Sequence, residues 1–523
     1  MTEEQFLAGD PKGPLRHRAF FQAAGELREG TYESDAMFAG LVVLRLLDKW
    51  AELRPETDEV AEARVADVEP VEAKIASLGD TPVKRILADL VTAIRDFSKG
   101  EADRRLARLI AYAQFLEQDQ HWEPAADVYG SAIEIIRTTG RDPDLLPLCY
   151  ERSARCLREI KQYVKAHELL SQGIGVATEE SDQARKSQDE HAMAWLDRRL
   201  ARMQIAMGML SGEMLEQEQE WESAAEIYAG TAELIKNHEH EKSQLPSCYE
   251  RAAYCLRQLG EIERAENLLN DGIEVALQLN DVHWSLHLRI SAAIVERHKG
   301  DLPEAEYELD TIIEDAESAK DELMLATALH ERGLVAYQRN QDAQSVEYCY
   351  AAAQRYPDPK LARRALLDAA VALGDLGHVQ YAQKVCQAVR RAPDDGRESR
   401  ALAGVNLMRY AALGDDRSTF DRLRVELESE SMSGRLRAHY YLFLGQGFRH
   451  FGDARAARKA FEQAIAEAER HRVYKLVVET EKLLAAADDR PVVWIEANQN
   501  PALAAMFGDI DAGRGLFAEA ATT

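Results

Sequence analysis

The sequence predicts an all-α protein built as an α-solenoid of antiparallel helix pairs with helical caps. Three observations support this prediction. Residues 116–177 recur without a gap as residues 215–276, and small and large apolar residues alternate at helical spacing over most of the chain. The third is the lack of the strand signals that accompany phosphate-binding and hydrolase motifs.

The internal duplication is clearest in two ten-residue segments, CYERSARCLR at 149–158 and CYERAAYCLR at 248–257. Every matched position lies 99 residues further along the chain in the second copy. The matched residues of the first copy include Trp122, Ala125, Tyr129, Pro147, Cys149, Ala166 and Gly173. The duplication therefore defines a unit that itself consists of two similar halves.

Within each half, a small residue on a second helix lies four residues before a larger apolar one. Near the end of the chain the full pattern is filled in order by Tyr441, Leu444, Gly445, Phe448, Ala457 and Phe461. This pattern resembles the tetratricopeptide repeat, a helix–turn–helix unit. The resemblance implies that helix pairs stack into a right-handed superhelix whose terminal pairs need caps.

The small residue of the second helix gives a count of nine repeats. It occurs at Ala125, Ala166, Ala224, Ala265, Ala305, Ser345, Ala382, Thr419 and Ala457. Successive steps are 41, 58, 41, 40, 40, 37, 37 and 38 residues. The weakest repeats are the fifth, with Arg289 where a large apolar residue is expected, and the eighth, with Thr419 at the small position and Leu407 on its first helix. We expect a duplicated block of four repeats at 104–279 and about five further repeats at 280–471.

Segments outside the repeats are expected to form caps. Residues 1–103 form an amino-terminal helical cap or degenerate repeats, with helices at 37–53 and 80–97 and a weaker helical segment at 57–78. Thr81 and Pro82 suit the start of the second of these helices. Residues 472–487 are expected to form a capping helix, and residues 488–523 a tail that packs on the last repeat or occupies the groove.

The 58-residue step leaves an insertion near 180–196. The chain from 182 to 219 contains no proline, which predicts one very long helix or an inserted helix. Met203, Met207 and Met214 share a helical face there, and such faces serve as core or as adaptable binding surfaces. We favour the core interpretation.

The paired cysteines of each copy are seven residues apart on a helix, about 10 Å along its axis. That separation is too large for a shared zinc ion or a disulfide, so we assign the cysteines to packing positions and predict no metal site. No Walker loop, dinucleotide fingerprint, HExxH helix or GxSxG elbow occurs, and we predict no enzyme activity and no cofactor.

The formal charge of −27 would repel nucleic acid and anionic membrane surfaces. The amino terminus lacks a basic start followed by an apolar core, and the longest apolar run, residues 36–44, is under half a membrane span. We therefore expect a cytoplasmic protein without nucleic-acid or membrane partners. The protein can also form homo-oligomers, because repeats at the ends of two solenoids can stack on one another.

The resemblance implies a concave groove, lined by the first helix of each repeat, that binds a segment of a partner protein. A non-enzymatic adaptor or scaffold is the function we expect; the alternative is a peptide- or ligand-sensing regulator that changes its superhelical pitch. The predicted groove residues are Arg155, Arg158, Tyr254, Arg257, Arg297, His298, His330, Tyr337, Gln446, Arg449 and His450.

Several of these residues are arginines, which bind carboxylates through forked hydrogen bonds, so an acidic or carboxy-terminal peptide is the expected partner. The sequence leaves a second interpretation open, in which neighbouring glutamates neutralise the arginines in surface ladders. Those glutamates are Glu117, Glu151, Glu213, Glu216 and Glu250.

Overall fold

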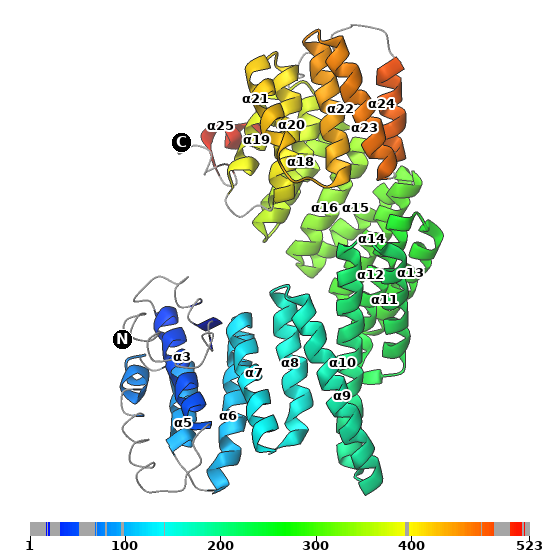
Figure 1. The fold of residues 1–523 in the computed structure, drawn as a ribbon. Coiled ribbons are helices and arrows are strands. Elements are labelled where there is room, and N and C mark those ends of the chain that lie inside the picture. Colours follow the sequence, from blue (N-terminus) through cyan, green and yellow to red (C-terminus); the bar gives the residue numbers. More distant parts are fainter. Residues whose placement is uncertain are drawn as a thin grey trace. The chain divides into compact units, whose positions relative to one another are not determined.

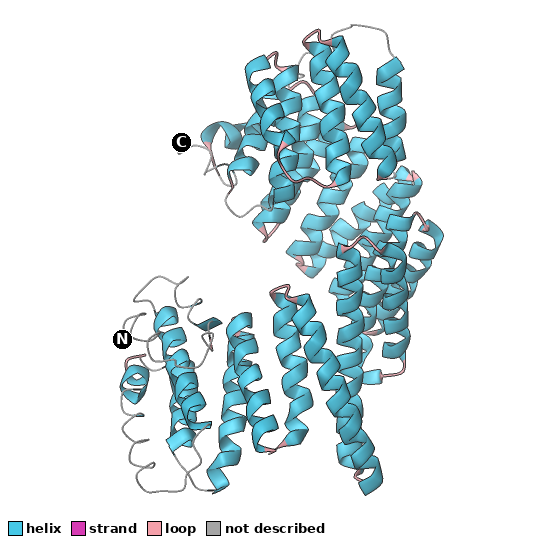
Figure 2. Ribbon diagram, in the orientation of Figure 1, coloured by secondary structure: helices cyan, strands magenta, loops and turns pink. Residues whose placement is uncertain are grey.

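The computed structural model consists of helices and their connecting turns (Figures 1 and 2). It describes residues 17, 19–20, 23, 32–51, 68, 71–78, 81–95, 99–140, 142–392, 397–471, 473–485, 503–514 and 517. Within these ranges no residue lies in a β-strand, which confirms the all-α prediction. The chain divides into two compact units, residues 1–261 and 262–523.

The first unit begins with α3 and α5, and from α6 onward each helix packs against the next. Thr81 caps α5, since its Oγ1 accepts a hydrogen bond of 3.4 Å from the Lys84 amide. Most of the weaker segment at 57–78 lies outside the described residues. The helices are α3 (Tyr32–Ala51), α5 (Pro82–Arg95), α6 (Lys99–Gln118), α7 (Trp122–Thr139), α8 (Leu146–Glu159), α9 (Tyr163–Ser187), α10 (Glu190–Gln217), α11 (Trp221–Lys236) and α12 (Leu245–Leu259), with 3-10 turns η1 (Pro143–Leu145) and η2 (Glu239–Gln244).

The second unit continues the pairing in chain order. Its helices are α13 (Ile262–Gln278), α14 (Val282–Lys299), α15 (Leu302–Ala319), α16 (Glu322–Gln338), α17 (Asp342–Arg355), α18 (Pro359–Asp375), α19 (Val379–Arg391), α20 (Arg397–Leu413), α21 (Arg417–Glu428), α22 (Gly434–His450), α23 (Ala454–Arg470), α24 (Tyr474–Ala485) and α25 (Ala504–Ala512). Aspartates cap many of these helices; Asp281 and Asp321, for example, each accept a hydrogen bond from an amide three residues on. Gly300 ends α14 with a left-handed φ of 92°.

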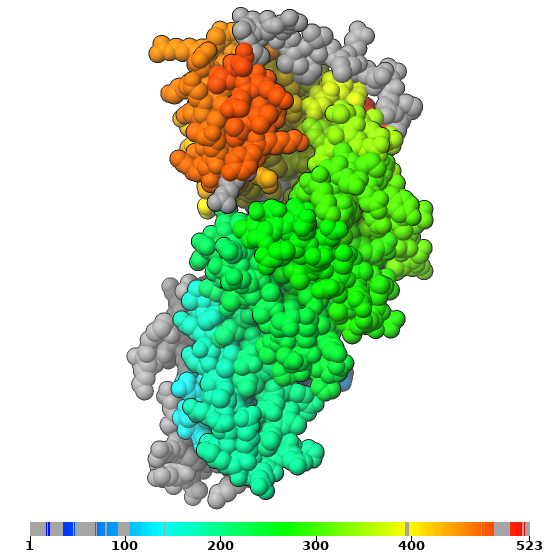
Figure 3. All heavy atoms as spheres, turned by 90° about the vertical axis from the view of Figure 1, so that its right-hand side faces the viewer, coloured from blue at the N-terminus to red at the C-terminus, as the bar shows by residue number. Residues whose placement is uncertain are grey.

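Packing inside each repeat follows the predicted pattern. A large side chain of the second helix lies against a small residue of the first, as Phe461 does against Gly445 and Tyr228 against Gly212. A Cβ atom on Gly445 would lie 2.6 Å from the Phe461 ring, so only glycine permits this approach. The chain has a tetratricopeptide-like helical repeat fold. Drawn as spheres, the heavy atoms of α23 and α24, orange, form a continuous packed surface (Figure 3).

The small residues that gave the repeat count confirm the pattern where they are buried. Eight of the nine are at most 3% exposed, from Ala125 on α7 to Ala457 on α23. Thr419 on α21 is half-buried, and its neighbour Phe420 fills the core instead, at 1% exposed. Of the two repeats that are weakest in the sequence, the eighth therefore departs from the packing pattern at its small residue, whereas Ala305 of the fifth is fully buried.

We expect Gly212→Ala to destabilise the first unit by about 1–3 kcal/mol, because the added methyl group would lie 2.4 Å from the Tyr228 ring. Gly230 on α11 is the control, since a Cβ there meets no atom within 4 Å. Gly230→Ala should stabilise the helix by about 0.5–1 kcal/mol. Urea unfolding measures both changes, and equal effects would contradict the packing argument.

The 58-residue step arises from two long helices. The chain turns at Gln188, where φ is 59°, so the extra residues lengthen the end of α9 and the start of α10. Asp189 caps α10 by accepting a 3.0 Å hydrogen bond from the Ala192 amide. Met203 is fully buried and Met207 packs against the same apolar cluster, which confirms the core interpretation of the methionine face.

All six cysteines are buried and none forms a disulfide. The Cys248 sulfur lies 3.2 Å from the sulfur of Met209. Burial raises the pKa of the Cys149 and Cys248 thiols to about 12. These thiols stay protonated at neutral pH and act as small packing groups.

The end of the chain departs from expectation. Helix α24 packs on α23 at the position expected for the cap. Within the described part of the tail, however, helix α25 lies against α19 and not on the last repeat, and it is drawn in red beside α19 in Figure 1. The apolar side chains Met506 and Ile510 explain this placement, because both are buried in the core of the second unit. Residues 486–502 lie outside the described part.

Glu180 on α9 gives the first unit a pH dependence. Burial, and secondarily the Asp144 carboxylate, raise the pKa of Glu180 from 4.5 to about 7. A raised carboxyl pKa stabilises the fold below the unfolded pKa, and that contribution is lost as pH rises through the folded value. We expect the free energy of unfolding, measured by urea titration, to fall by roughly 1–2 kcal/mol between about pH 5 and pH 8, after discounting for partial exposure. Glu180→Gln should flatten this slope, and an unchanged slope would exclude Glu180 as its source.

Candidate partner-binding groove

Two of the three predicted groove arginines of the first unit, Arg155 and Arg158, are paired with glutamates. The guanidinium of Arg158 on α8 forms two hydrogen bonds to Glu213 on α10, the Nε–Oε2 bond being 3.1 Å long. Arg155 lies 3.3 Å from the Glu117 carboxylate and keeps 57% of its side chain exposed. Glu151 pairs in turn with Arg199. These contacts are those of the second interpretation, in which glutamates neutralise the arginines.

A buried triad repeats with the duplication. Tyr129 and Arg152 both donate to the Glu117 carboxylate over 3.0 Å. Ninety-nine residues on, the Tyr228 hydroxyl donates to Glu216 over 2.6 Å, and Arg251 lies 3.0 Å from the same carboxylate. The triad joins the first helix of one repeat to its own second helix and to the first helix of the next repeat. Sequence reasoning did not single it out, although its recurrence at 99 residues was visible.

The other two predicted residues of this unit form an aromatic cluster. Tyr254 on α12 makes an edge contact with Trp221, with ring centroids 5.9 Å apart. The Arg257 guanidinium carbon lies 5.3 Å from the centroid of the same tyrosine ring. This stack holds Arg257 over a ring of its own helix.

In the second unit several predicted residues are also held by local partners. Arg297 lies 3.2 Å from Glu331, and His450 lies 3.3 Å from Asp415. His330 is 7% exposed, and its Nε2 lies 2.8 Å from Asp368.

Two further predicted residues of this unit lie at the ends of α22 and α14. Arg449 donates a hydrogen bond to the Leu483 carbonyl and packs over the Phe461 ring. His298 is exposed in the last turn of α14.

Two predicted residues, Tyr337 and Gln446, come together in a groove of about 600 Å³. The groove is lined by α16, α18, α20, α22 and α24, which are the first helices of successive pairs and the cap. Its apolar lining includes Leu402, Leu436 and Phe443. This volume falls within the roughly 300–1,000 Å³ that ligand sites occupy.

A buried asparagine lies in the groove lining. Asn406 on α20 is 4% exposed, and none of the described residues hydrogen-bonds its side chain. Its amide offers two donors and an acceptor, and neither amide atom is among the fully buried, unpartnered side-chain atoms of the described residues, so the amide reaches the solvent in the groove. An unpaired amide in a groove is therefore a group that a ligand can satisfy.

A fixed guanidinium lies one helical turn away, at Arg409. It donates to Asp375 over 2.8 Å, and the Tyr337 hydroxyl donates to the other oxygen of that carboxylate over 2.7 Å. The guanidinium also packs over the Phe443 ring, 5.0 Å from its centroid. Burial, and then the Asp375 charge, raise the pKa of the Tyr337 hydroxyl, so it remains a donor at neutral pH. This network fixes the groove wall between α16, α18 and α20.

The groove rim carries opposite charges. Arg364 on α18 and Arg435 at the start of α22 are exposed, and neither forms an ion pair or a side-chain hydrogen bond within the described residues. Glu479 on α24 is likewise exposed and unpaired in the described part. Glu398, by contrast, accepts hydrogen bonds from the Ser433 amide and hydroxyl. Two cations and one anion are thus available to a ligand.

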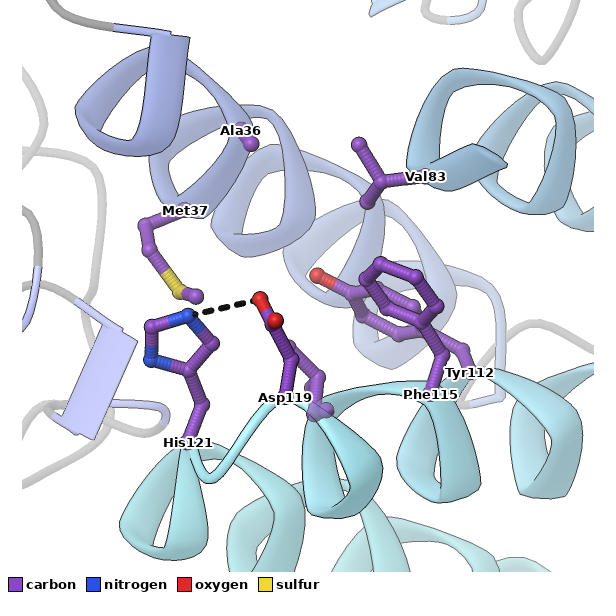
Figure 4. A pocket seen from close by; sticks show the side chains of 8 residues that line it. Ala36, Met37, Val83, Tyr112, Phe115, Asp119 and His121 are labelled. Carbon is purple, nitrogen blue, oxygen red and sulfur yellow. Dashed lines mark ion pairs between the residues drawn. The ribbon is translucent and has the colours of Figure 1, made fainter. Parts of the chain in front are cut away.

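The first unit has a much smaller pocket, shown in Figure 4. Met37 of α3, Val83 of α5 and Tyr112 of α6 face it together with His121, whose Nε2 lies 3.2 Å from Asp119. Its volume of about 40 Å³ holds about one water molecule. It is too small to bind a peptide or a cofactor.

Sequence reasoning missed the polar residues of the groove. Asn406, Arg364 and Arg435 lie on first helices, where the family pattern predicts a concave surface. The pattern marks packing positions, however, and says nothing about which groove-facing residues lack partners inside the chain. An asparagine in the middle of a strongly apolar helix, ALAGVNLMRYAAL at 401–413, was the available signal.

No protein-family model and no curated protein matches the chain. Several solved structures are similar to the chain at low sequence identity. The apo form of RapI is 10% identical, with a TM-score of 0.47, and the match covers 71% of this chain and 98% of RapI. The apo quorum sensor NprR from B. thuringiensis is 14% identical, with a TM-score of 0.48 and coverages of 71% and 99%. NprR in complex with its cognate peptide NprX is 14% identical, with a TM-score of 0.42 and coverages of 74% and 100%.

No helix among the described residues combines the length and apolar character needed to cross a membrane.

Proposed function

We propose that this protein is a non-enzymatic binding protein that takes a short, extended segment of a partner into the groove of α16, α18, α20, α22 and α24. The observation that carries the proposal is the buried Asn406 amide, which has no partner among the described residues and lines a groove of about 600 Å³. A carboxamide matches a peptide group, because each offers an N–H donor and a C=O acceptor side by side. An extended backbone has such groups free, whereas a helix uses them internally.

The rim charges give the segment a direction. Arg364 and Arg435 suit a carboxylate, either an acidic side chain or a carboxy terminus, through forked hydrogen bonds. Glu479 suits an ammonium group at the α24 end of the groove. This partner agrees with the acidic or carboxy-terminal peptide expected from the sequence, but the arginines that receive it differ from the predicted ones.

The adaptor and the sensor would use the same groove. In an adaptor the segment tethers a partner and the helices keep their spacing. In a sensor the segment draws together α16 and α24, which line opposite parts of the groove, and changes the pitch of the second unit. Solution scattering with and without a bound peptide separates them, since only the sensor compacts.

The proposal is tested by selecting random short peptides with free carboxy termini on the full-length protein. We expect selected peptides to carry a terminal or side-chain carboxylate and to lose about tenfold or more in affinity on Arg364→Glu/Arg435→Glu. Arg158→Glu is the matched control, because that arginine is already paired with Glu213 in the first unit. Peptides that bind the groove variant and wild type equally would refute the groove assignment.

A further inference from the structure

Helix α25 occupies a face that the groove does not use. The Phe507 ring stacks on Tyr381 of α19, with centroids 4.0 Å apart and planes 16° apart, and lies 4.9 Å from the His378 ring. Both partner residues lie on or just before a second helix, whereas the groove is lined by first helices. Met506 and Ile510 of the same helix are buried beneath it.

Polar contacts flank the stacked rings. Asp511 accepts a hydrogen bond of 2.6 Å from Lys384 and one of 3.0 Å from the Tyr381 hydroxyl. The hydroxyl of Tyr350, on α17, donates to Asp509. The hydrogen bonds from Lys384 and Tyr381 lower the pKa of Asp511, so its carboxylate remains charged well below neutral pH. We call the receiving surface, made of Tyr350, His378, Tyr381 and Lys384, the outer site.

The outer site binds α25 as it would bind a separate ligand. Its residues come from the sixth and seventh repeats, and the described residues of α25 add no helix pair to the repeat array. The contact consists of one aromatic stack, three polar contacts and four buried apolar side chains on or beside a nine-residue helix, those of Leu503, Met506, Ile510 and Phe517. Contacts of this size are weak between separate molecules and persist within one chain because the effective concentration is in the millimolar range. Such an element opens far more often than the core.

We propose that α25 also docks in the outer site of a second copy, so that two chains form a dimer by exchanging their carboxy-terminal helices. Each copy carries the same site and the same ligand, and exchange recreates every contact without any new surface. The chains repel one another through their net charge of −27, but at physiological salt this repulsion is screened beyond about 8 Å. Exchange therefore increases with protein concentration and with salt. The dimer presents two grooves and binds a repeated partner more tightly than one groove does.

The test uses two full-length variants, Lys384→Cys and Asp511→Cys, mixed and treated with a short bismaleimide. All six native cysteines are buried, so wild-type protein serves as the unreactive control. The lost ion pair is exposed and costs little. We expect a covalent dimer that links one chain of each kind and whose yield rises with protein concentration. Phe507→Ala in the Asp511→Cys chain should reduce that yield about tenfold, because the ring stack is lost.

A double variant that carries both new cysteines shows whether α25 reaches its site at all. Closure only within single chains, with no mixed dimer at any concentration, would overturn the proposal. So would a mixed dimer that forms equally well with Phe507→Ala, because it would then arise from random collision. Denaturing electrophoresis of chains with different tags distinguishes these products.

Discussion

Asn406→Leu should weaken peptide binding by roughly 30- to 150-fold while leaving the fold as stable as before or more stable. The leucine has nearly the same volume, and it removes an amide that is buried at 4% exposure without a partner among the described residues. Two lost hydrogen bonds to the peptide backbone correspond to about 2–3 kcal/mol, or roughly 30- to 150-fold in affinity. Calorimetric titration with a selected peptide and thermal unfolding measure the two effects.

The opposite signs of the two effects distinguish a binding residue from a structural one. If Asn406 stabilised α20, its replacement would lower the unfolding midpoint together with the affinity. Asn267→Leu on α13 is the control for the chemical change, since this exposed asparagine does not line the groove and its replacement should leave peptide affinity unchanged. Normal peptide binding by Asn406→Leu would remove the observation on which the proposed function rests.

The sequence predicted the helix pairs well because local spacing determines them. The glycines and alanines that face larger side chains recur at fixed intervals, and contacts such as Gly445 with Phe461 join residues of one repeat. The cap at Thr81 and the packing role of the cysteines followed from the same short-range reasoning.

The candidate site could not be predicted in the same way because it depends on contacts between repeats. Arg158 was a plausible ligand-binding residue until its partner Glu213, 55 residues away, was placed beside it. Likewise the contact of Tyr350 with Asp509 spans 159 residues, and no local pattern indicates that α25 reaches the outer site. Which polar groups remain unpaired is a property of the assembled repeats.

Pairing inside the duplicated repeats also leads to the largest stability effect we expect. Glu117 is 5% exposed and receives hydrogen bonds from Tyr129 and Arg152, so Glu117→Leu leaves a tyrosine hydroxyl and a guanidinium without their acceptor. Breaking a buried pair costs about 3–5 kcal/mol, and we expect about 2–4 kcal/mol because the side chain of Arg152 is 32% exposed.

The second copy provides an internal replicate of this prediction. Glu216→Leu should cost a similar amount, because Tyr228 and Arg251 repeat the same contacts. Glu233→Leu is the control, since its pair with Lys236 is exposed and contributes under about 1 kcal/mol. Hydrogen exchange in α7 and α11 should rise only when the triad of the corresponding repeat is broken. If neither helix lost protection, the buried tyrosines would have stayed in place without their carboxylate. The surrounding apolar packing would then hold the triads, and the triads would not stabilise the packing.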